Sequence, residues 1–190
     1  ANESIDTADV NVQLKIYKST LYDGKTEEIR TDAASVLLLH ESEQARTILL
    51  DALEQNESIG ARVAVCKALS QARASQKTIS NPEDFVDPLL TMLTEENLSR
   101  AKFAAEALLL YDYNQIAEKL ASIVSDPSNT ARARINGIYA LQIQPDMKAI
   151  FMLMDLLEDS EKNIRIEAEQ ALNEIGIPIG NNKRARKQIK

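Results

Sequence analysis

Apolar residues recur along the chain in blocks, and each block ends on a leucine that follows an alanine or a valine. Successive closing leucines lie 32, 39, 33 and 31 residues apart. The closing leucines are Leu37, Leu69, Leu108, Leu141 and Leu172. The side chains four residues before them are also apolar or absent: Ala33, Val65, Ala104, Gly137 and Ala168. A period of about 30 to 40 residues is typical of a stacked-repeat protein, in which each repeat contacts mainly its neighbours.

The residue pattern of each repeat predicts two helices. The first, helix A, carries a Leu-Leu-x-x-Leu pattern such as Leu49, Leu50 and Leu53, which lays an apolar stripe along one side of a helix. The second, helix B, ends on the closing leucine. The predicted A/B pairs are 43–55/57–73, 82–95/97–112, 113–125/129–143 and 145–158/161–175, with an earlier pair at 8–22/26–41.

Two places depart from the regular pattern. The alternation from Val10 to Ile16 would suit a strand, whereas the spacing of Val10, Leu14 and Leu21 fits one face of a helix. The Tyr22-Asp23-Gly24 stop that follows favours the helix. Pro88 falls inside the third predicted A helix, so we expect it to bend that helix.

The A-helix leucines, an arginine early in helix B and the closing alanine–leucine pair resemble the HEAT-repeat family, in particular its short bacterial variants. The resemblance covers about residues 26–176 and implies an all-α, armadillo-like fold, a right-handed α–α superhelix (solenoid) of about five helical hairpins. Residues 1–25 would then be a degenerate first helix and lead-in. Residues 177–190 would be a basic C-terminal tail or the start of a further segment.

The family's early arginine stands in four of the five B helices, and Ala101 replaces it in the third. A ladder of arginines could bind acidic ligands. The resemblance instead implies a structural role, in which each guanidinium bonds a carboxylate or a carbonyl of a neighbouring repeat, and we favour that interpretation. The four arginines are Arg30, Arg62, Arg134 and Arg165.

The distribution of charge along the chain limits the kinds of partner that the protein can bind. The chain has a net charge of −7, yet residues 183–190 hold five basic residues and no acidic one. The rest of the chain carries 17 basic and 29 acidic residues, a net charge of −12. Such a body repels phosphate backbones, so we expect no nucleic acid partner. The tail is interpreted as a solvated terminus, with contact to an anionic surface as the alternative. The longest apolar run, residues 149–154, is too short to span a membrane.

No residue pattern predicts catalysis, a cofactor or a metal site. His40 is the only histidine, so it cannot complete a ligand set with another, and we expect it to be partly buried or at an edge. Cys66 stands in an apolar stretch and is expected to behave as an inert, small hydrophobic residue. We therefore expect a protein that is not an enzyme.

The outward side of the B helices gives the candidate site. Successive residues are about 100° apart around a helix, so positions five and two before the closing leucine and two after it face away from the core. The third and fourth repeats place apolar residues there, which marks either an interface or packing between repeats. The candidate partner-binding residues are Lys67, Phe103, Glu106, Leu110, Tyr139 and Ile143.

These features favour a non-catalytic protein–protein interaction scaffold that binds a protein partner along the concave B-helix face. One alternative is an accessory or lyase-like module associated with an enzyme or pigment, since HEAT-like repeats also occur in bilin-attachment lyases. Another is a structural spacer in a longer repeat protein. A monomer and a cytoplasmic location are favoured; an exported mature fragment stays open because the chain starts at Ala1.

Overall fold

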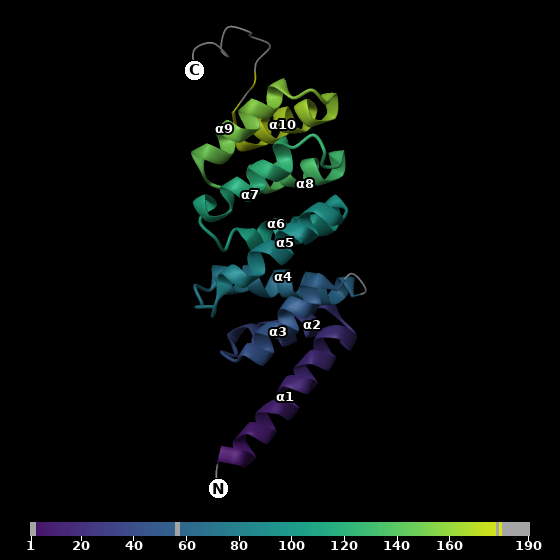
Figure 1. Ribbon diagram of the computed structural model, residues 1–190, viewed down its shortest axis with the longest axis vertical. Coiled ribbons are helices and arrows are strands. Elements are labelled where there is room, and N and C mark those ends of the chain that lie inside the picture. The colour runs from purple at the N-terminus through teal and green to yellow at the C-terminus, as the bar shows by residue number, and fades with distance from the viewer. Residues whose placement is uncertain (1–2, 56–57, 178, 180–190) are drawn as a thin grey trace. The chain divides into compact units, whose positions relative to one another are not determined.

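The computed structural model describes residues 3–55, 58–177 and 179, and side chains from residue 9 onward (Figure 1). All regular elements within these ranges are helices, which confirms the all-α prediction. The chain divides into two compact units, an N-terminal unit of residues 1–110 and a C-terminal unit of residues 111–190. The predicted basic tail falls almost wholly outside the described residues.

The N-terminal unit contains three helical hairpins. Its elements are α1 (Glu3–Asp23), α2 (Glu27–Leu39), α3 (Glu43–Glu54), α4 (Ile59–Ala74), the 3₁₀ helix η1 (Pro82–Phe85), α5 (Val86–Glu95) and α6 (Leu98–Leu108). Helix α1 packs on α2, α3 on α4, and α5 on α6. The second helices also pack on one another in the order α2, α4, α6, and the first helices in the order α1, α3, α5. Each hairpin therefore lies against the next.

The C-terminal unit contains two hairpins of the same kind. Its elements are α7 (Tyr113–Ser125), α8 (Ala131–Gln142), α9 (Met147–Asp155), the 3₁₀ helix η2 (Leu156–Glu158) and α10 (Lys162–Ile175). Helix α7 packs on α8, and α9 with η2 packs on α10. Helices α8 and α10 lie against each other, as do α7 and α9.

The repeating apolar positions form the core of both units. All five closing leucines are at most 1% exposed, and Leu49, Leu89 and Leu120 of the first helices are equally buried. Burying one such side chain contributes about 2 kcal/mol. Gly137, four residues before a closing leucine, faces the first helix of its own hairpin: a Cβ added to it would lie 2.6 Å from Val124 Cγ1. The residue pattern thus fixes which face of each helix turns inward.

Polar side chains set the starts of several helices. Thr26, Ser42, Asn97 and Thr130 each accept a hydrogen bond from the backbone N–H three residues further on. This satisfies one of the donors that the first turn of a helix leaves without an internal partner. The last helix ends where Gly176 adopts a left-handed conformation with φ 93°.

The structure shows what becomes of the two places where the sequence departs from the regular pattern. The segment from Val10 to Ile16 is helical, as its helix-face spacing favoured, and α1 begins earlier than predicted. Pro88 lies nearer to the start of its α-helix than the sequence predicted. The third hairpin begins with η1, and α5 starts at Val86, so Pro88 lies in the first turn of α5. The first turn of a helix has no internal partner for its N–H groups, so the proline removes no helical hydrogen bond there.

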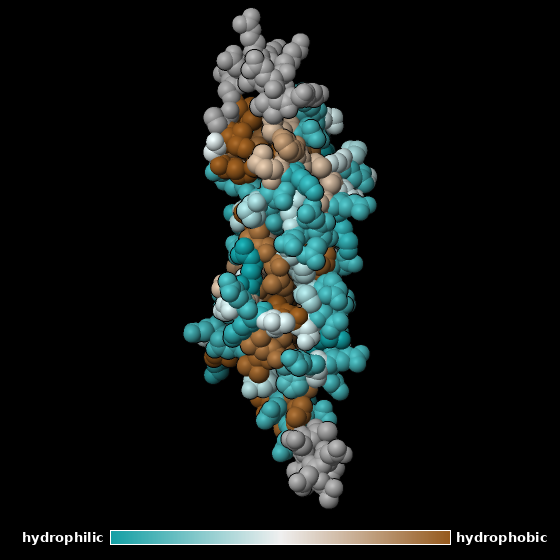
Figure 2. Space-filling model, turned by 90° about the vertical axis from the view of Figure 1, so that its left-hand side faces the viewer, coloured by the Kyte–Doolittle hydropathy of each residue, from teal (hydrophilic) through white to brown (hydrophobic). Residues whose placement is uncertain are grey.

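The face that Figure 2 shows is mostly polar, with apolar side chains that interrupt it. Among the described residues, none of the helices combines the length and the apolar character that crossing a bilayer requires.

Candidate functional site

The six predicted partner-binding residues fall into two groups. Lys67 lies on α4, Phe103 and Glu106 lie on α6, and Leu110 follows α6, all in the N-terminal unit. The C-terminal unit holds the other two. Tyr139 lies on α8, and Ile143 is the residue that ends α8.

Lys67 and Phe103 come together in the structure. The Lys67 ammonium lies 5.0 Å from the centroid of the Phe103 ring and forms an ion pair with Glu27 of α2. A cation over an aromatic ring is stabilising by about 0.5–1 kcal/mol at an exposed site. Lys67 thus links the second helices of three hairpins, and its charge is already engaged within the unit.

Fewer positions of the B helices face outward than the sequence predicted. The position five before the closing leucine is fully buried in two hairpins, at Ala64 and Asn136, so its expected outward orientation is wrong there. Glu106 is exposed, whereas Phe103 and the other apolar candidates are half-buried. The half-buried candidates are Leu110, Tyr139 and Ile143 in addition to Phe103.

A groove of about 280 Å³ opens on this side between α2 and α4. Its rim contains Asp32, Ser35 and Leu39 of α2 and Gln71 of α4, which occupy the predicted outward positions of the first two repeats. Ser35 Oγ donates to Gln71 Oε1 at 3.4 Å, and Leu39 is 41% exposed. The sequence contained a signal for this groove: Leu39 stands two residues after a closing leucine, as Leu110 does.

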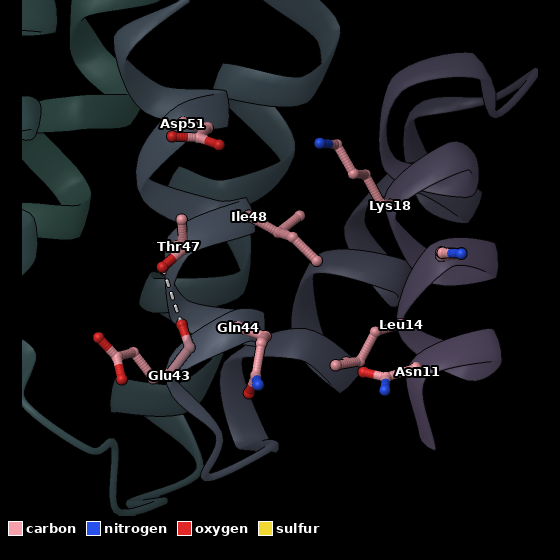
Figure 3. Close-up of a pocket in the computed structure, with 9 residues that line it drawn as sticks. Asn11, Leu14, Lys18, Glu43, Gln44, Thr47, Ile48 and Asp51 are labelled. Atoms are coloured by element: carbon pink, nitrogen blue, oxygen red, sulfur yellow. Dashed lines mark hydrogen bonds between the residues drawn. The ribbon is translucent and has the colours of Figure 1, made fainter. Parts of the chain in front are cut away.

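A larger groove of about 540 Å³ lies between α1 and α3 (Figure 3). Helix α1 contributes Asn11, Leu14, Lys15 and Lys18 to it. Helix α3 contributes Glu43, Gln44, Thr47, Ile48 and Asp51.

The two walls of this larger groove carry opposite charges. Lys15 and Lys18 line the groove from α1, and Glu43 and Asp51 line it from α3. Figure 3 shows the apolar side chains of Leu14 and Ile48 extending between the two helices. The sequence prediction missed this groove because it treated the first helix as degenerate. The spacing of Asn11, Lys15 and Lys18 places all three on one side of a helix and could have indicated it.

Tyr22 lies one turn beyond Lys18. Its hydroxyl is buried and has no hydrogen-bond partner among the described residues. Burial of the ring, followed by the nearby charge of Asp51, raises the pKa of the Tyr22 hydroxyl. Both effects disfavour the phenolate.

His40 and Cys66 have the positions that the sequence predicted. His40 is half-buried at the end of α2, next to a small cavity that Arg46 and Phe85 also line. The Cys66 sulfur is buried 3.6 Å from the Met92 sulfur, and burial raises the pKa of the thiol to about 12. Within the described part of the chain, no group of three or more histidine, cysteine, aspartate or glutamate residues is placed to hold a metal ion.

Two of the repeated arginines are completely buried and bond the turn of the following hairpin. Arg62 Nη1 lies 3.0 Å from Glu96 Oε1, and its Nη2 lies 3.8 Å from the Glu95 carboxylate. Arg134 Nη1 lies 3.0 Å from Glu161 Oε1 and also bonds Asp159. These contacts confirm the structural role that we favoured.

The other two arginines bond carbonyls within their own hairpins. Arg30 Nη1 donates to the Gly24 carbonyl, and Arg165 Nη1 donates to the carbonyls of Asp159 and Ser160 at 2.6 and 2.9 Å. The expected bond to a neighbouring repeat is therefore wrong for these two, although the carbonyl partners are of the predicted kind.

Comparison with known proteins gives no family. No protein-family model matches the sequence, and no curated protein matches it. One solved structure that resembles it is an engineered protein from the Northeast Structural Genomics Consortium, with 19% sequence identity and a TM-score of 0.40. The match covers 88% of this chain and 79% of that one. At that TM-score we draw no conclusion from the likeness.

Proposed function

We propose that this protein is a non-catalytic protein-binding scaffold, built as a right-handed solenoid of HEAT-like hairpins. A segment of the partner would occupy the groove between α2 and α4 and extend over Lys67, Phe103, Glu106 and Leu110. Tyr139 and Ile143 would serve the same role on the C-terminal unit. The observation that carries the proposal is the position of the groove, which lies on the side of the second helices that the repeat pattern turns outward.

The composition of the groove supports a protein ligand. Leu38, Ala68 and Ala72 line it and are buried, whereas Asp32 and Gln71 are exposed. An apolar centre with a polar rim is the usual arrangement of a protein interface. The volume of about 280 Å³ lies just below the range of about 300–1,000 Å³ for small-molecule pockets. It suits one or two side chains of a partner better than a cofactor.

Selection of peptides from a displayed random library on the purified protein would test this function. Leu39→Asp should weaken binding of the selected peptides by about tenfold or more, because it places a charge beside the apolar centre of the groove. Leu98→Asp is the matched control, since Leu98 is 37% exposed, lies outside the groove and begins α6. Circular dichroism would verify that both variants fold.

Two outcomes would contradict the proposal. The first is that selection yields no peptide with measurable affinity. The second is that the selected peptides bind wild type and Leu39→Asp equally well.

A further inference from the structure

The groove between α2 and α4 is lined by one acidic and one basic side chain. Asp32 lies on α2, Lys77 follows the end of α4, and both are exposed. The other residues that line the groove are uncharged. In the described part of the chain, neither charge belongs to an ion pair. Both charges are therefore available to a bound molecule.

The two helices that form the groove run in the same direction. Near their starts, Arg30 of α2 lies against Gly60 of α4, since a Cβ added to that glycine would be 2.8 Å from the arginine Nε. Further along both helices, Ser35 Oγ donates to Gln71 Oε1. The groove therefore has one end near the starts of both helices and one end near their C-termini.

Asp32 and Lys77 lie at opposite ends of this groove. Asp32 precedes Ser35 by three residues, which is about 4.5 Å along α2. Lys77 follows Gln71 by six residues and lies beyond the end of α4. The Lys77 N–H donates to the Ala72 carbonyl at 2.9 Å, which holds the backbone of this lysine against the C-terminus of the helix. The contact between Ser35 and Gln71 thus lies between the two charges.

The part of the groove between the charges is apolar. Leu38, Ala68 and Ala72 are buried there, and Leu39 is 41% exposed at the rim. Helix α2 advances by about 10 Å from Asp32 to Leu39, whereas an extended chain advances by about 3.3 Å per residue. Side chains that reach the two ends are therefore about three residues apart in an extended ligand.

We propose that this groove selects extended peptide segments with one basic and one acidic side chain about three residues apart and an apolar side chain between them. The basic group lies at Asp32 and the acidic group at Lys77. Charge attraction at both ends provides the selectivity, because a segment with either charge reversed meets a like charge. This inference rests on the proposed function, since it specifies the chemistry of the segment that the scaffold binds.

Selection from a displayed random peptide library, carried out in parallel on wild type and on two charge-reversal variants, would test the inference. Peptides selected on wild type should carry one basic and one acidic residue around an apolar residue. Peptides selected on Asp32→Lys should carry acidic residues at both positions. Peptides selected on Lys77→Glu should carry basic residues at both positions.

The affinity of one peptide selected on wild type gives a second readout. Each charge-reversal variant should bind it about fivefold more weakly than wild type, because an attractive exposed pair becomes a repulsive one. The difference should shrink in about 0.5 M salt, which screens exposed charges. Arg73→Glu is the matched control for Lys77→Glu, since Arg73 is exposed on α4 and does not line the groove. It should bind the peptide within about twofold of wild type.

The outcomes separate this inference from the proposed function. If all three proteins select peptides with the same charges, or if Arg73→Glu changes the selection as much as Lys77→Glu does, the charge preference is refuted while the binding groove remains. If none of the proteins selects a peptide with measurable affinity, the proposed function is refuted and this inference with it.

Discussion

At the scale of single residues, the buried arginines show how this fold tolerates charge in its interior. Burying a guanidinium is unfavourable unless its donors find partners. Arg134 finds them on two elements: Nε donates to the Val124 carbonyl at 2.8 Å, and the remaining donors reach Asp159 and Glu161. The same side chain therefore closes its own hairpin and holds the turn of the next.

Replacing Arg134 should be strongly destabilising. Arg134→Met keeps much of the volume but leaves the Val124 carbonyl and Asp159 without this donor, and we expect the free energy of unfolding to fall by about 3 kcal/mol. Arg132→Met is the control, because Arg132 is exposed on the same helix, and it should change stability by less than about 0.5 kcal/mol. Urea unfolding would measure both, and equal stabilities would refute the role assigned to Arg134.

Asp159 gives a prediction about acid stability. Its partial burial opposes ionisation, but hydrogen bonds from Arg134 and from the Glu161 N–H hold the pKa of the Asp159 carboxyl below its ordinary value. Protons therefore bind the unfolded state more readily than the folded state. This contribution to stability is complete above about pH 4, the unfolded pKa, and is lost as pH falls through the folded pKa.

Unfolding of wild type and Asp159→Asn as a function of pH would measure this effect. Asparagine retains an acceptor for the Glu161 N–H but does not titrate as the carboxylate does. The stability difference between the two proteins should be constant above about pH 5 and should shrink below about pH 4. A stability difference between the two proteins that stays constant down to pH values well below 4 would contradict the role assigned to Asp159.

At the scale of elements, the repeat pattern predicted the helices better than their ends. The apolar stripes that define α3 to α10 depend on local periodicity, which the sequence shows directly. Pro88 was misjudged because η1 precedes α5, and the point where a 3₁₀ turn becomes an α-helix depends on packing around Phe85, which is buried. The close contact at Gly137 is likewise a property of two packed helices.

Gly137→Ala should be destabilising even though alanine is the better helix former by about 1 kcal/mol. The added Cβ would lie 2.6 Å from Val124 Cγ1 and 3.0 Å from Ile123 Cγ2, and both neighbours are stiff, β-branched side chains on α7. We expect a net loss of about 1–2 kcal/mol in the free energy of unfolding.

Gly60→Ala offers the matched comparison. Its Cβ would lie 2.8 Å from Arg30 Nε, near the end of a flexible side chain that can move aside. It should lose less stability than Gly137→Ala in the same urea titration. The reverse order would show that α7 and α8 can separate more readily than their packing indicates.

At the scale of the whole molecule, the sequence predicted an all-helical protein but not its grooves. A groove depends on how far two helices from different hairpins stand apart, and the side chains that decide this distance are far apart in sequence. The grooves were therefore missed, although Leu39 and the lysines of α1 were visible. The pairing of Lys67 with Glu27 and Phe103 was missed for the same reason.

The single thiol should report on unfolding of the N-terminal unit. Cys66 is fully buried and its pKa is raised to about 12, so the folded protein should react with iodoacetamide at pH 8 far more slowly than a free cysteine. In rising concentrations of urea, the labelling rate should follow the loss of helical circular dichroism. Rapid labelling of the native protein would contradict the burial of α4.

The arginine contacts also suggest a rule for adding or removing hairpins within a unit by design. Arg62 and Arg134 belong to hairpins that are followed by another in the same unit, and each bonds an acidic turn there. Arg30, also followed by a hairpin, instead lies close to Gly60 of α4. Ala101 and Arg165 lie in the last helices of their units. An inserted internal hairpin should therefore carry arginine seven residues before its closing leucine, and the hairpin after it should begin its second helix behind an acidic turn.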